Sequence, residues 1–383
     1  MTTRPFPIRH ALAAAALLTF AAAAPAQSVK IAVLQELSGA GATAGTNARN
    51  GAMLAVREIN AAGGILGRKI DAAVSDTQSN PGVAKGLAAK AVDDDVFAVI
   101  GPTFSGSIMV SMAETRKAQI PNFTGGEAAA ITEQGNPFIF RTSFTQAAAM
   151  PKIARYIAND LKAKTVAVLF VNNDFGKGGR DSFGKAAEAA GLKVVADIST
   201  ESGQVDWSSP VLRAKQSNAD VIFVYTNEEE SARALRELRK QGVTKPLVGE
   251  TTLTGQKVIE LAGDAANGAL AHVGLTVDAP IPAMQTFRAA YEKEYKSISD
   301  HNGIKGYTAI YMLKAGIEAV GKFDRIAVAK ALHGMSISAA KVPGVIMDVS
   351  IDQNGDLDRE SFIVEVRGGK QEIKATLPPL GRK

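Results

Sequence analysis

Residues 221–242 have the sequence VIFVYTNEEESARALRELRKQG, in which an apolar β-branched run comes directly before a helical pattern. Val221 to Tyr225 is apolar throughout, which is typical of a strand that is buried on both faces. Ser231 to Gln241 has the spacing of a helix, and Gly242 is a residue type that commonly ends one. The acidic run Glu228 to Glu230 is favourable charge at the start of that helix. This stretch predicts a strand followed by a helix, which is the repeating unit of an α/β fold.

The same alternation runs along most of the chain. Further strand-like runs lie at Val29 to Leu34, Val96 to Ile100, Val166 to Phe170 and Val194 to Ile198. Segments with helical spacing, such as Asn47 to Ala61, lie between them. Strands buried on both faces and separated by helices predict a doubly wound parallel sheet.

The pattern occurs twice, at residues 29–124 and 164–273, and this predicts two lobes. Two further helices are expected at 281–295 and 307–320, before a β-rich tail at 345–366. Because this tail is too small to stand alone, it must join a lobe, so the chain crosses between the lobes more than once. Ligands in such folds bind at the carboxyl ends of the strands, which places the expected site in the cleft between the lobes.

The amino terminus has the pattern of a secretory signal. Arg4 and Arg9 precede the apolar run Ala11 to Ala24, and the triplet Ala24-Pro25-Ala26 predicts cleavage after Ala26. A signal peptide at residues 1–26 leaves 357 of the 383 residues as the mature chain. No later stretch approaches 18 uninterrupted apolar residues, so we expect a soluble protein in a periplasm.

Composition narrows the function classes. The chain has no cysteine, so the expected core must hold the exported fold without disulfides, and the usual lipid-attachment residue is absent. Removing Arg4 and Arg9 lowers the net charge by two, from +5 to +3. This balance is too mild to predict a nucleic-acid or membrane partner.

Several local motifs suggest other chemistry but fit it poorly. The glycines at 39, 41 and 45 lack dinucleotide-loop spacing, and Gly101 to Ser107 lacks the lysine of a P-loop, so it is expected to be a strand-to-helix turn that suits a carboxylate. The acidic residues between Asp352 and Asp358 lack the closing glutamate of a calcium loop and predict a hairpin turn. The histidines have no metal-ligand spacing, and no catalytic triad motif is present. We therefore expect no cofactor, no metal and no enzymatic activity.

One longer motif carries a family resemblance. The segment 59–70, INAAGGILGRKI, resembles the hallmark of the type I periplasmic solute-binding proteins of the Leu/Ile/Val-binding family. Further motifs in the order of that family are Leu37-Ser38-Gly39, Val99-Ile100-Gly101-Pro102, Phe140-Arg141-Thr142, Asp174-Phe175-Gly176 and Asp352 to Asp356. The resemblance covers essentially the whole mature chain.

The resemblance implies a monomeric Venus-flytrap receptor that delivers a small molecule to the membrane permease of an ABC importer. It implies three hinge crossovers near residues 143, 275 and 343. The first lobe would be residues 27–143 plus 276–343, and the second lobe residues 144–275 plus 344–383. The implied ligand is an amino acid or a similar small carboxylate. Alternatives are an aromatic acid, an amide or urea on the same scaffold, or a sensor that signals to a membrane partner.

The resemblance also implies a ligand site. Its implied residues are Phe104, Ser105, Gly125, Gly126 and Glu127 from the first lobe and Phe175, Asn227, Glu250 and Thr251 from the second. Ser105 and the segment 125–127 would bind the α-carboxylate, and an acidic group near Glu250 would bind the α-ammonium. Ser105 could instead cap a helix, Phe175 could be core packing, and Glu127 and Glu250 could be solvated loop acids.

Three departures from the family pattern bear on the ligand. Glu127 stands where many relatives have a hydroxyl residue, so it would repel a ligand carboxylate or recruit a second cation. Glu250 is displaced by one position, with Thr251 at the expected place. Ala44 replaces an aromatic wall, which enlarges the expected pocket. A larger, more polar or cationic amino acid is therefore a plausible ligand.

Overall fold

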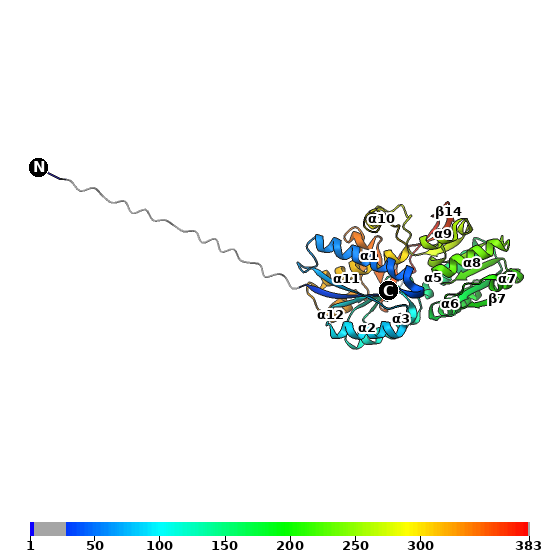
Figure 1. Ribbon diagram of the computed structural model, residues 1–383, viewed down its shortest axis with the longest axis horizontal. Helices are drawn as coiled ribbons and strands as arrows, with labels where there is room; N and C mark the ends of the chain where they lie inside the picture. The colour runs from blue at the N-terminus through cyan, green and yellow to red at the C-terminus, as the bar shows by residue number, and fades with distance from the viewer. Residues whose placement is uncertain (4–27, 382–383) are drawn as a thin grey trace.

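The computed structural model describes residues 1–3 and 28–381. The predicted cleavage site after Ala26 and nearly all of the predicted signal peptide lie outside the described residues. Within the part of the chain that is described, no helix is long and apolar enough to cross a membrane. From residue 28 onward the chain forms two lobes that lie side by side (Figure 1).

The first lobe is built on a five-stranded sheet with the order β2-β1-β3-β4-β5, in which every neighbouring pair is parallel. Its strands are β1 (Val29–Gln35), β2 (Ile70–Asp76), β3 (Ala98–Ile100), β4 (Asn122–Thr124) and β5 (Ile139–Arg141). Its helices are α1 (Ala42–Ala61), α2 (Pro81–Asp93), α3 (Ser105–Lys117), α4 (Ala130–Glu133), α10 (Pro282–Tyr295), α11 (His301–Val320) and α12 (Arg325–Leu332).

Successive residues of β1 enter two different cores. Ile31 and Val33 pack in the core that includes α1 and α11, whereas Ala32 and Leu34 pack in the core that includes α2. Figure 1 shows α1 and α2 on opposite sides of this sheet. Full burial of a side chain the size of isoleucine contributes roughly 1.5–3 kcal/mol, so both faces of the sheet stabilise the lobe.

The second lobe is built on a seven-stranded sheet with the order β15-β14-β10-β9-β8-β6-β7. Its strands are β6 (Thr165–Val171), β7 (Lys193–Thr200), β8 (Val221–Tyr225), β9 (Leu247–Glu250), β10 (Leu270–Val273), β14 (Ser361–Arg367) and β15 (Lys370–Leu377). Strands β6 to β10 are parallel, and β14 and β15 add antiparallel pairs at one edge. Its helices are α5 (Gln146–Asn159), α6 (Asp174–Ala189), α7 (Ser208–Gln216), α8 (Glu228–Lys240) and α9 (Gln256–Ala262).

Strand β8 has the bounds that its apolar run predicts, and every residue of it is buried. Val221 and Phe223 pack in the core that includes α5 and α6, and Ile222 and Val224 pack in the core that includes α8 and α9. Helix α8 begins at Glu228, three residues before the predicted helical pattern, because the acidic run forms its first turn. The predicted architecture of two doubly wound parallel-sheet lobes is confirmed.

Helices α1 and α11 approach each other through glycines. A Cβ atom added at Gly51 would lie 1.9 Å from the Gly303 carbonyl oxygen, and one added at Gly306 would lie 2.0 Å from the Ala48 carbonyl oxygen. A side chain at either position would therefore push the two backbones apart. This close packing fixes the first turns of α11, which contribute to the site described below.

The tail of the chain is β-rich, as predicted, and is divided between two sheets. The strands β11 (Ser336–Ile337), β12 (Val349–Ile351) and β13 (Leu357–Asp358) form a small antiparallel sheet, and β14 joins the second lobe. The expected hairpin turn is present, and Asp352 Oδ1 accepts bonds from the backbone N–H groups of Asn354 and Asp356 at 2.8 and 2.9 Å.

The lobe boundaries near residues 143, 275 and 343 stay predictions. Because β12 pairs with β11 and Arg141 N donates to the Gly355 carbonyl, residues 349–358 lie against elements of the first lobe. We propose that the third crossover lies between Asp358 and Ser361 rather than near residue 343.

Candidate functional site

A cavity of about 310 Å³ lies between the lobes, at the carboxyl ends of strands from both sheets. Residues from the first lobe that line it are Ala40, Ala44, Ser79, Pro81, Thr103, Phe104, Ser105, Gly106, Ser107, Gly125, Gly126, Glu127, His301, Asn302 and Lys305. Those from the second lobe are Asn173, Asp174, Phe175, Ser202, Asn227, Glu228 and Thr252. The cavity therefore includes every predicted site residue except Glu250 and Thr251.

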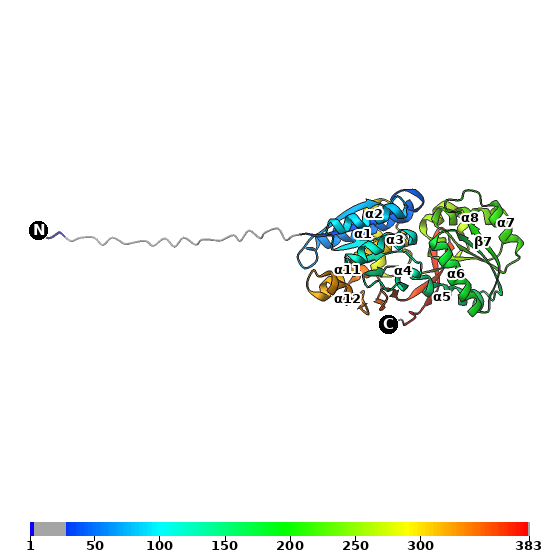
Figure 2. The ribbon, with the colours of Figure 1, turned by 90° about the horizontal axis from the view of Figure 1, so that it is seen from below.

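Hydrogen bonds join the two lobes around this cavity. Thr43 Oγ1 donates to Glu229 Oε1 at 2.7 Å, and Asn302 Nδ2 donates to Glu228 Oε1 at 3.0 Å. The Tyr225 hydroxyl, from the second lobe, donates to Glu127 Oε2 of the first at 3.2 Å. The lobes are thus closed on each other, and α3 and α6 face one another at the cleft (Figure 2).

The amino terminus of α3 presents unpaired backbone donors to the cavity. The first helical bond runs from Ile108 N to the Phe104 carbonyl, so the N–H groups of Ser105, Gly106 and Ser107 precede it. Such a helix terminus favours an anion. The turn is held from behind by Glu36, whose buried carboxylate accepts from Thr103 N and Phe104 N at 3.0 and 3.1 Å.

Ser105 is the first residue of α3 and its hydroxyl does not cap the helix, for which Phe104 is the N-cap. The Ser105 Oγ accepts a long bond of 3.3 Å from Ala128 N and is buried in the wall of the cavity. The alternative that Ser105 merely caps a helix is therefore wrong. Whether Ser105 contacts a ligand stays a prediction.

The loop 125–128 is fixed by a buried arginine. Arg141 Nε donates to Asp356 Oδ1 at 2.6 Å, and Arg141 Nη2 donates to the Ala128 carbonyl at 3.1 Å. A third bond runs from Arg141 Nη1 to the Gly126 carbonyl. These contacts join two motifs of the family resemblance, the one around Arg141 and the one around Asp356, and they position the backbone that lines the cavity.

Glu127 is buried and paired within the protein. Its Oε1 lies 2.8 Å from Lys305 Nζ, and its Oε2 accepts from Tyr225. Burial raises the pKa of Glu127 to about 7, with a further rise from Glu250, whereas Lys305 opposes the shift. The cation that Glu127 recruits is therefore the chain's own Lys305, and the alternative of a solvated loop acid is wrong.

Phe175 lies in the first turn of α6 and forms an aromatic wall of the cavity. Its ring stacks on Tyr225, with 4.2 Å between the centroids and 23° between the planes. The turn is fixed by Asn173, whose Oδ1 accepts from Gly176 N at 2.9 Å. Phe175 thus both packs against Tyr225 and lines the cavity, which joins the two roles predicted for it.

Asn227 and Glu228 reach the cavity from the start of α8. The Asn227 side chain and backbone N–H both donate to Glu230 Oε2, at 2.9 and 3.0 Å, which fixes the entry into the helix. Glu228 is buried, and its Oε1 lies 4.0 Å from His301 Nε2 in addition to its bond with Asn302. Burial, together with the nearby Asp300, raises the pKa of Glu228 to about 8.

Glu250 is buried but does not line the cavity. It accepts from the hydroxyl and the backbone N–H of Thr251, at 2.7 and 2.5 Å, and its Oε1 lies 3.2 Å from His272 Nδ1. Burial lowers the pKa of His272 to about 3, so this contact is a hydrogen bond to a neutral ring rather than an ion pair. Glu250 is therefore no solvated loop acid, and its polar atoms already have partners.

His301, Asn302 and Lys305 of α11 and Glu228 of α8 line the cavity but were not among the predicted site residues. His301, Asn302 and Lys305 lie far along the chain from the other site residues, and α1 packing brings them to the cleft. No local pattern in the sequence of α11 marks them as site residues. Glu228 was predicted to be favourable charge at the start of a helix. It does lie in the first turn of α8, but the prediction did not include its burial at the cavity.

Among the described residues, no cluster of three or more His, Cys, Asp or Glu side chains is arranged for a metal ion.

Comparison with known proteins decides the family. A model of the periplasmic binding proteins matches residues 28–371. The Leu/Ile/Val-binding protein homolog 3 of Brucella melitensis biotype 1 is 30% identical over 357 residues, which cover 92% of this chain and 94% of that protein. The chain belongs to the periplasmic binding protein family.

Solved structures of the type I periplasmic binding proteins share the fold. The branched-chain amino acid transporter substrate binding protein LivJ of Streptococcus pneumoniae, in complex with isoleucine, superposes with a TM-score of 0.82 at 25% identity and covers 92% of this chain and 100% of its own. An R. palustris solute binding protein in complex with benzoate has a TM-score of 0.85 at 23% identity and covers 93% of this chain and 98% of its own, which shows the fold alone. This periplasmic binding protein is thus of the Leu/Ile/Val-binding type.

Proposed function

We propose that this periplasmic binding protein is the receptor of an ABC importer for a small α-amino acid, which it binds in the closed interlobe cleft. The observation that carries the proposal is the pairing of opposite recognition groups across one cavity. Unpaired N–H groups of α3 lie on the first lobe, and the buried Glu228 lies on the second. A carboxylate and an ammonium on one small molecule complement this arrangement.

The size and walls of the cavity support a small ligand. Its volume of about 310 Å³ is at the lower end of the roughly 300–1,000 Å³ of small-molecule sites. Gly126 has no room for a side chain, because an added Cβ atom would lie 2.3 Å from Ile108 Cδ1. In the proposed complex the ligand carboxylate lies against Ser105, Gly106 and the loop at Gly125, and the ligand side chain lies between Phe104 and Phe175.

Glu228 is the proposed partner of the ligand ammonium, in place of Glu250. Glu250 already accepts bonds from Thr251 and lies outside the cavity, whereas Glu228 lines it. Glu127 is neutralised by Lys305, so Glu228 is the acid of the inner wall that lacks a close cationic partner among the described residues. A buried carboxylate is stabilised by a cation, and the ligand would supply one.

A thermal-shift screen tests the ligand class. The set contains α-amino acids, their deaminated acids, aromatic acids, short amides and urea. Saturation at 100 times the Kd should add about 2.7 kcal/mol to the free energy of unfolding. We expect α-amino acids to raise the melting temperature most. Stabilisation by aromatic acids alone would contradict the proposal and favour the benzoate-type ligand seen in the R. palustris relative.

The next experiments test export to the periplasm and the role of the protein as a receptor. The proposed mature protein begins at Gln27 and is released from the periplasm by osmotic shock. Mass spectrometry of the released protein should give a chain that lacks residues 1–26. A full-length chain, or fractionation with the cytoplasm, would contradict export. Conversion of the bound ligand by the purified protein would contradict a receptor function.

A further inference from the structure

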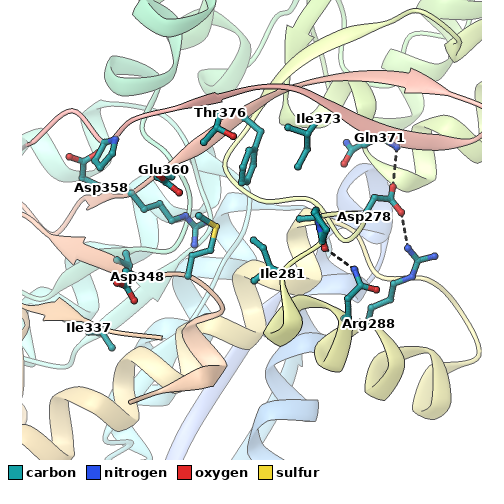
Figure 3. Close-up of a pocket in the computed structure, with 18 of the residues that line it drawn as sticks. Asp278, Ile281, Arg288, Ile337, Asp348, Asp358, Glu360, Gln371, Ile373 and Thr376 are labelled. Carbon is teal, nitrogen blue, oxygen red and sulfur yellow. Dashed lines mark hydrogen bonds and ion pairs between the residues drawn. The ribbon is translucent and has the colours of Figure 1, made fainter. Parts of the chain in front are cut away.

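A second cavity is a groove that shares no residue with the cleft. It has a volume of about 1560 Å³ and lies where α10, the small sheet and the strands β14 and β15 meet (Figure 3). Figure 3 shows Ile281 and Ile337 on one side of the groove and Ile373 and Thr376 on the other. Its walls therefore come from the first lobe and from the antiparallel edge of the second.

The groove holds a buried cation, Arg359, that has no counterion among the described residues. Arg359 lines the groove with an exposure of 6%, and no carboxylate of the described residues lies within ion-pair distance of its guanidinium. Its Nε is buried without a hydrogen-bond partner, and its closest aromatic contact is Phe144, with 5.9 Å from Cζ to the ring centroid. Burial lowers the pKa of Arg359 to about 10. A buried guanidinium without a partner is costly, so an anion in the groove would stabilise it.

Two acidic residues of the groove, Asp278 and Asp348, already accept hydrogen bonds from other groups. Asp278 accepts from Arg288 Nη1 at 2.7 Å and from Gln371 N at 3.0 Å, as the dashed lines in Figure 3 show. Asp348 Oδ1 accepts from Ala339 N at 2.7 Å. Neither acid is in a position to neutralise Arg359. Among the described residues, no carboxylate of the groove therefore neutralises Arg359.

The acids next to Arg359 in the sequence do not pair with it either. Asp358 accepts from Leu380 N and Gly381 N at 3.0 and 2.7 Å, and Glu360 is exposed. Much of the remaining wall is apolar, from Ile281, Phe362 and Ile373. The lining thus combines one buried cation with apolar surface.

We infer that this groove is a second binding site, for a carboxylate attached to an apolar body, with Arg359 as the group that binds the carboxylate. A guanidinium binds a carboxylate through two parallel N–H bonds, which fixes the orientation of the ligand. The apolar body then lies along Ile281, Phe362 and Ile373. The volume exceeds the roughly 300–1,000 Å³ of ordinary small-molecule sites, so an elongated ligand fits better than a compact one.

Octanoate is the probe, and the methyl group of Met347 is the reporter, because Met347 lines the groove and lies outside the cleft. The protein is labelled with ¹³C at the methionine methyl groups. We expect octanoate to shift the Met347 resonance in a saturable manner. Octanamide, which has the same chain without the charge, should cause no saturable shift. Equal shifts with both probes, or a linear shift without saturation, would overturn the proposal.

Two arginine variants test whether Arg359 is the group that binds the octanoate carboxylate. Arg359→Met removes the buried cation and should abolish the octanoate shift, a loss of at least tenfold in affinity. Arg367→Met is the matched control, since Arg367 also lines the groove but is exposed and paired with Glu365 at 3.0 Å, and it should leave the affinity unchanged. Unchanged binding by Arg359→Met would overturn the proposal. The octanamide comparison on the wild-type protein decides the question even if this variant does not fold.

A C-terminal amide distinguishes an external ligand from the chain's own end. A full-length protein whose terminal carboxylate is replaced by an amide should bind octanoate as the wild type does. Binding that is seen only with the amide would show that the chain's terminal carboxylate is the anion, and the proposal would be overturned.

Discussion

At the scale of single residues, the cleft contains more buried carboxyl groups than cations. Glu127 is paired with Lys305, whereas Glu228 has Asn302 as its donor and the neutral His301 nearby. The pKa of Glu228 is raised to about 8, mainly by burial, so the empty protein holds this carboxyl protonated at pH 7. A ligand ammonium would favour the ionised form. Ligand binding and proton release are therefore coupled at this residue.

The affinity for an α-amino acid should rise with pH. Below a pKa of about 8 the carboxyl must lose a proton when the ammonium binds, so the affinity should increase up to about tenfold per pH unit and level off above pH 8. Calorimetry at pH 6, 7 and 8 measures this slope. Glu228→Gln is the control and should remove most of it, leaving the contribution of Glu127. A slope that is the same in this variant would assign the proton to another group.

The stability of the empty protein should have the opposite slope. The unfolded chain loses the Glu228 proton near pH 4.5, whereas the folded protein keeps it up to about pH 8. Between these values the folded state binds more protons, so the free energy of unfolding decreases as the pH rises. Urea denaturation of the ligand-free protein across this range should show the decrease, and Glu228→Gln should reduce it.

Arg141 holds the cavity loop through bonds to the Gly126 and Ala128 carbonyls. Its ion pair with Asp356 is buried, with side-chain exposures of 0% and 7%. Arg141→Met should lower the free energy of unfolding by about 3–5 kcal/mol, because it leaves Asp356 buried without its cation. Urea denaturation measures the loss. The control is Arg180→Met, since Arg180 pairs with Asp197 at the surface and should contribute only about 0–1 kcal/mol. Equal losses in the two variants would contradict the role of burial.

At the scale of elements, the position of α11 determines which side chains reach the cleft. Its contact with α1 leaves no room for a Cβ atom at Gly306. Gly306→Ala should destabilise the protein by about 1–3 kcal/mol and weaken ligand binding, because His301, Asn302 and Lys305 move with the helix. Gly86→Ala is the control, since Gly86 is in α2 with nothing within 4 Å of an added Cβ atom, and it should stabilise by about 0.4–1 kcal/mol.

Elements that are apolar throughout could be predicted from the sequence. β8 has its predicted bounds, whereas α8 begins three residues and α11 six residues before the predicted helical patterns, at Glu228 and His301. β2 was not among the predicted runs because it is an edge strand with the mixed sequence IDAAVSD and several exposed residues. A continuous apolar run is a local feature of the sequence, so a strand that has one can be predicted from a short stretch.

From the sequence, site residues could be predicted only where they belong to motifs that come after a predicted strand. Ser105, Glu127 and Phe175 lie in the loops or first helical turns after β3, β4 and β6, and they line the cavity. Glu250 is the last residue of β9, but its side chain bonds to Thr251, and this depends on a rotamer that the sequence does not encode locally. Lys305 and Arg359 owe their surroundings to contacts between distant segments, so no local pattern identified them.

At the scale of the whole molecule, closure assembles the site. The contacts of Thr43 with Glu229 and of Tyr225 with Glu127 join residues of the two lobes. A ligand that contacts both walls stabilises the closed arrangement over the open one by its differential affinity for the two. The proposed carboxylate and ammonium sites lie on opposite lobes, so an amino acid supplies this difference, whereas a ligand with one of the two groups supplies only part of it.

Calorimetry on Glu228→Gln with two matched ligands tests the central claim most directly. The ligands are an α-amino acid that stabilises the protein in the thermal-shift screen and the same molecule without its amino group. A desolvated contact to a charged group contributes about 1.5–3 kcal/mol, so the variant should bind the amino acid roughly ten- to hundredfold more weakly and the deaminated acid almost as the wild type does. Glu250→Gln, which alters an acid outside the cavity, should not discriminate between the two ligands. Equal weakening of both ligands by Glu228→Gln, or discrimination by Glu250→Gln instead, would contradict the account.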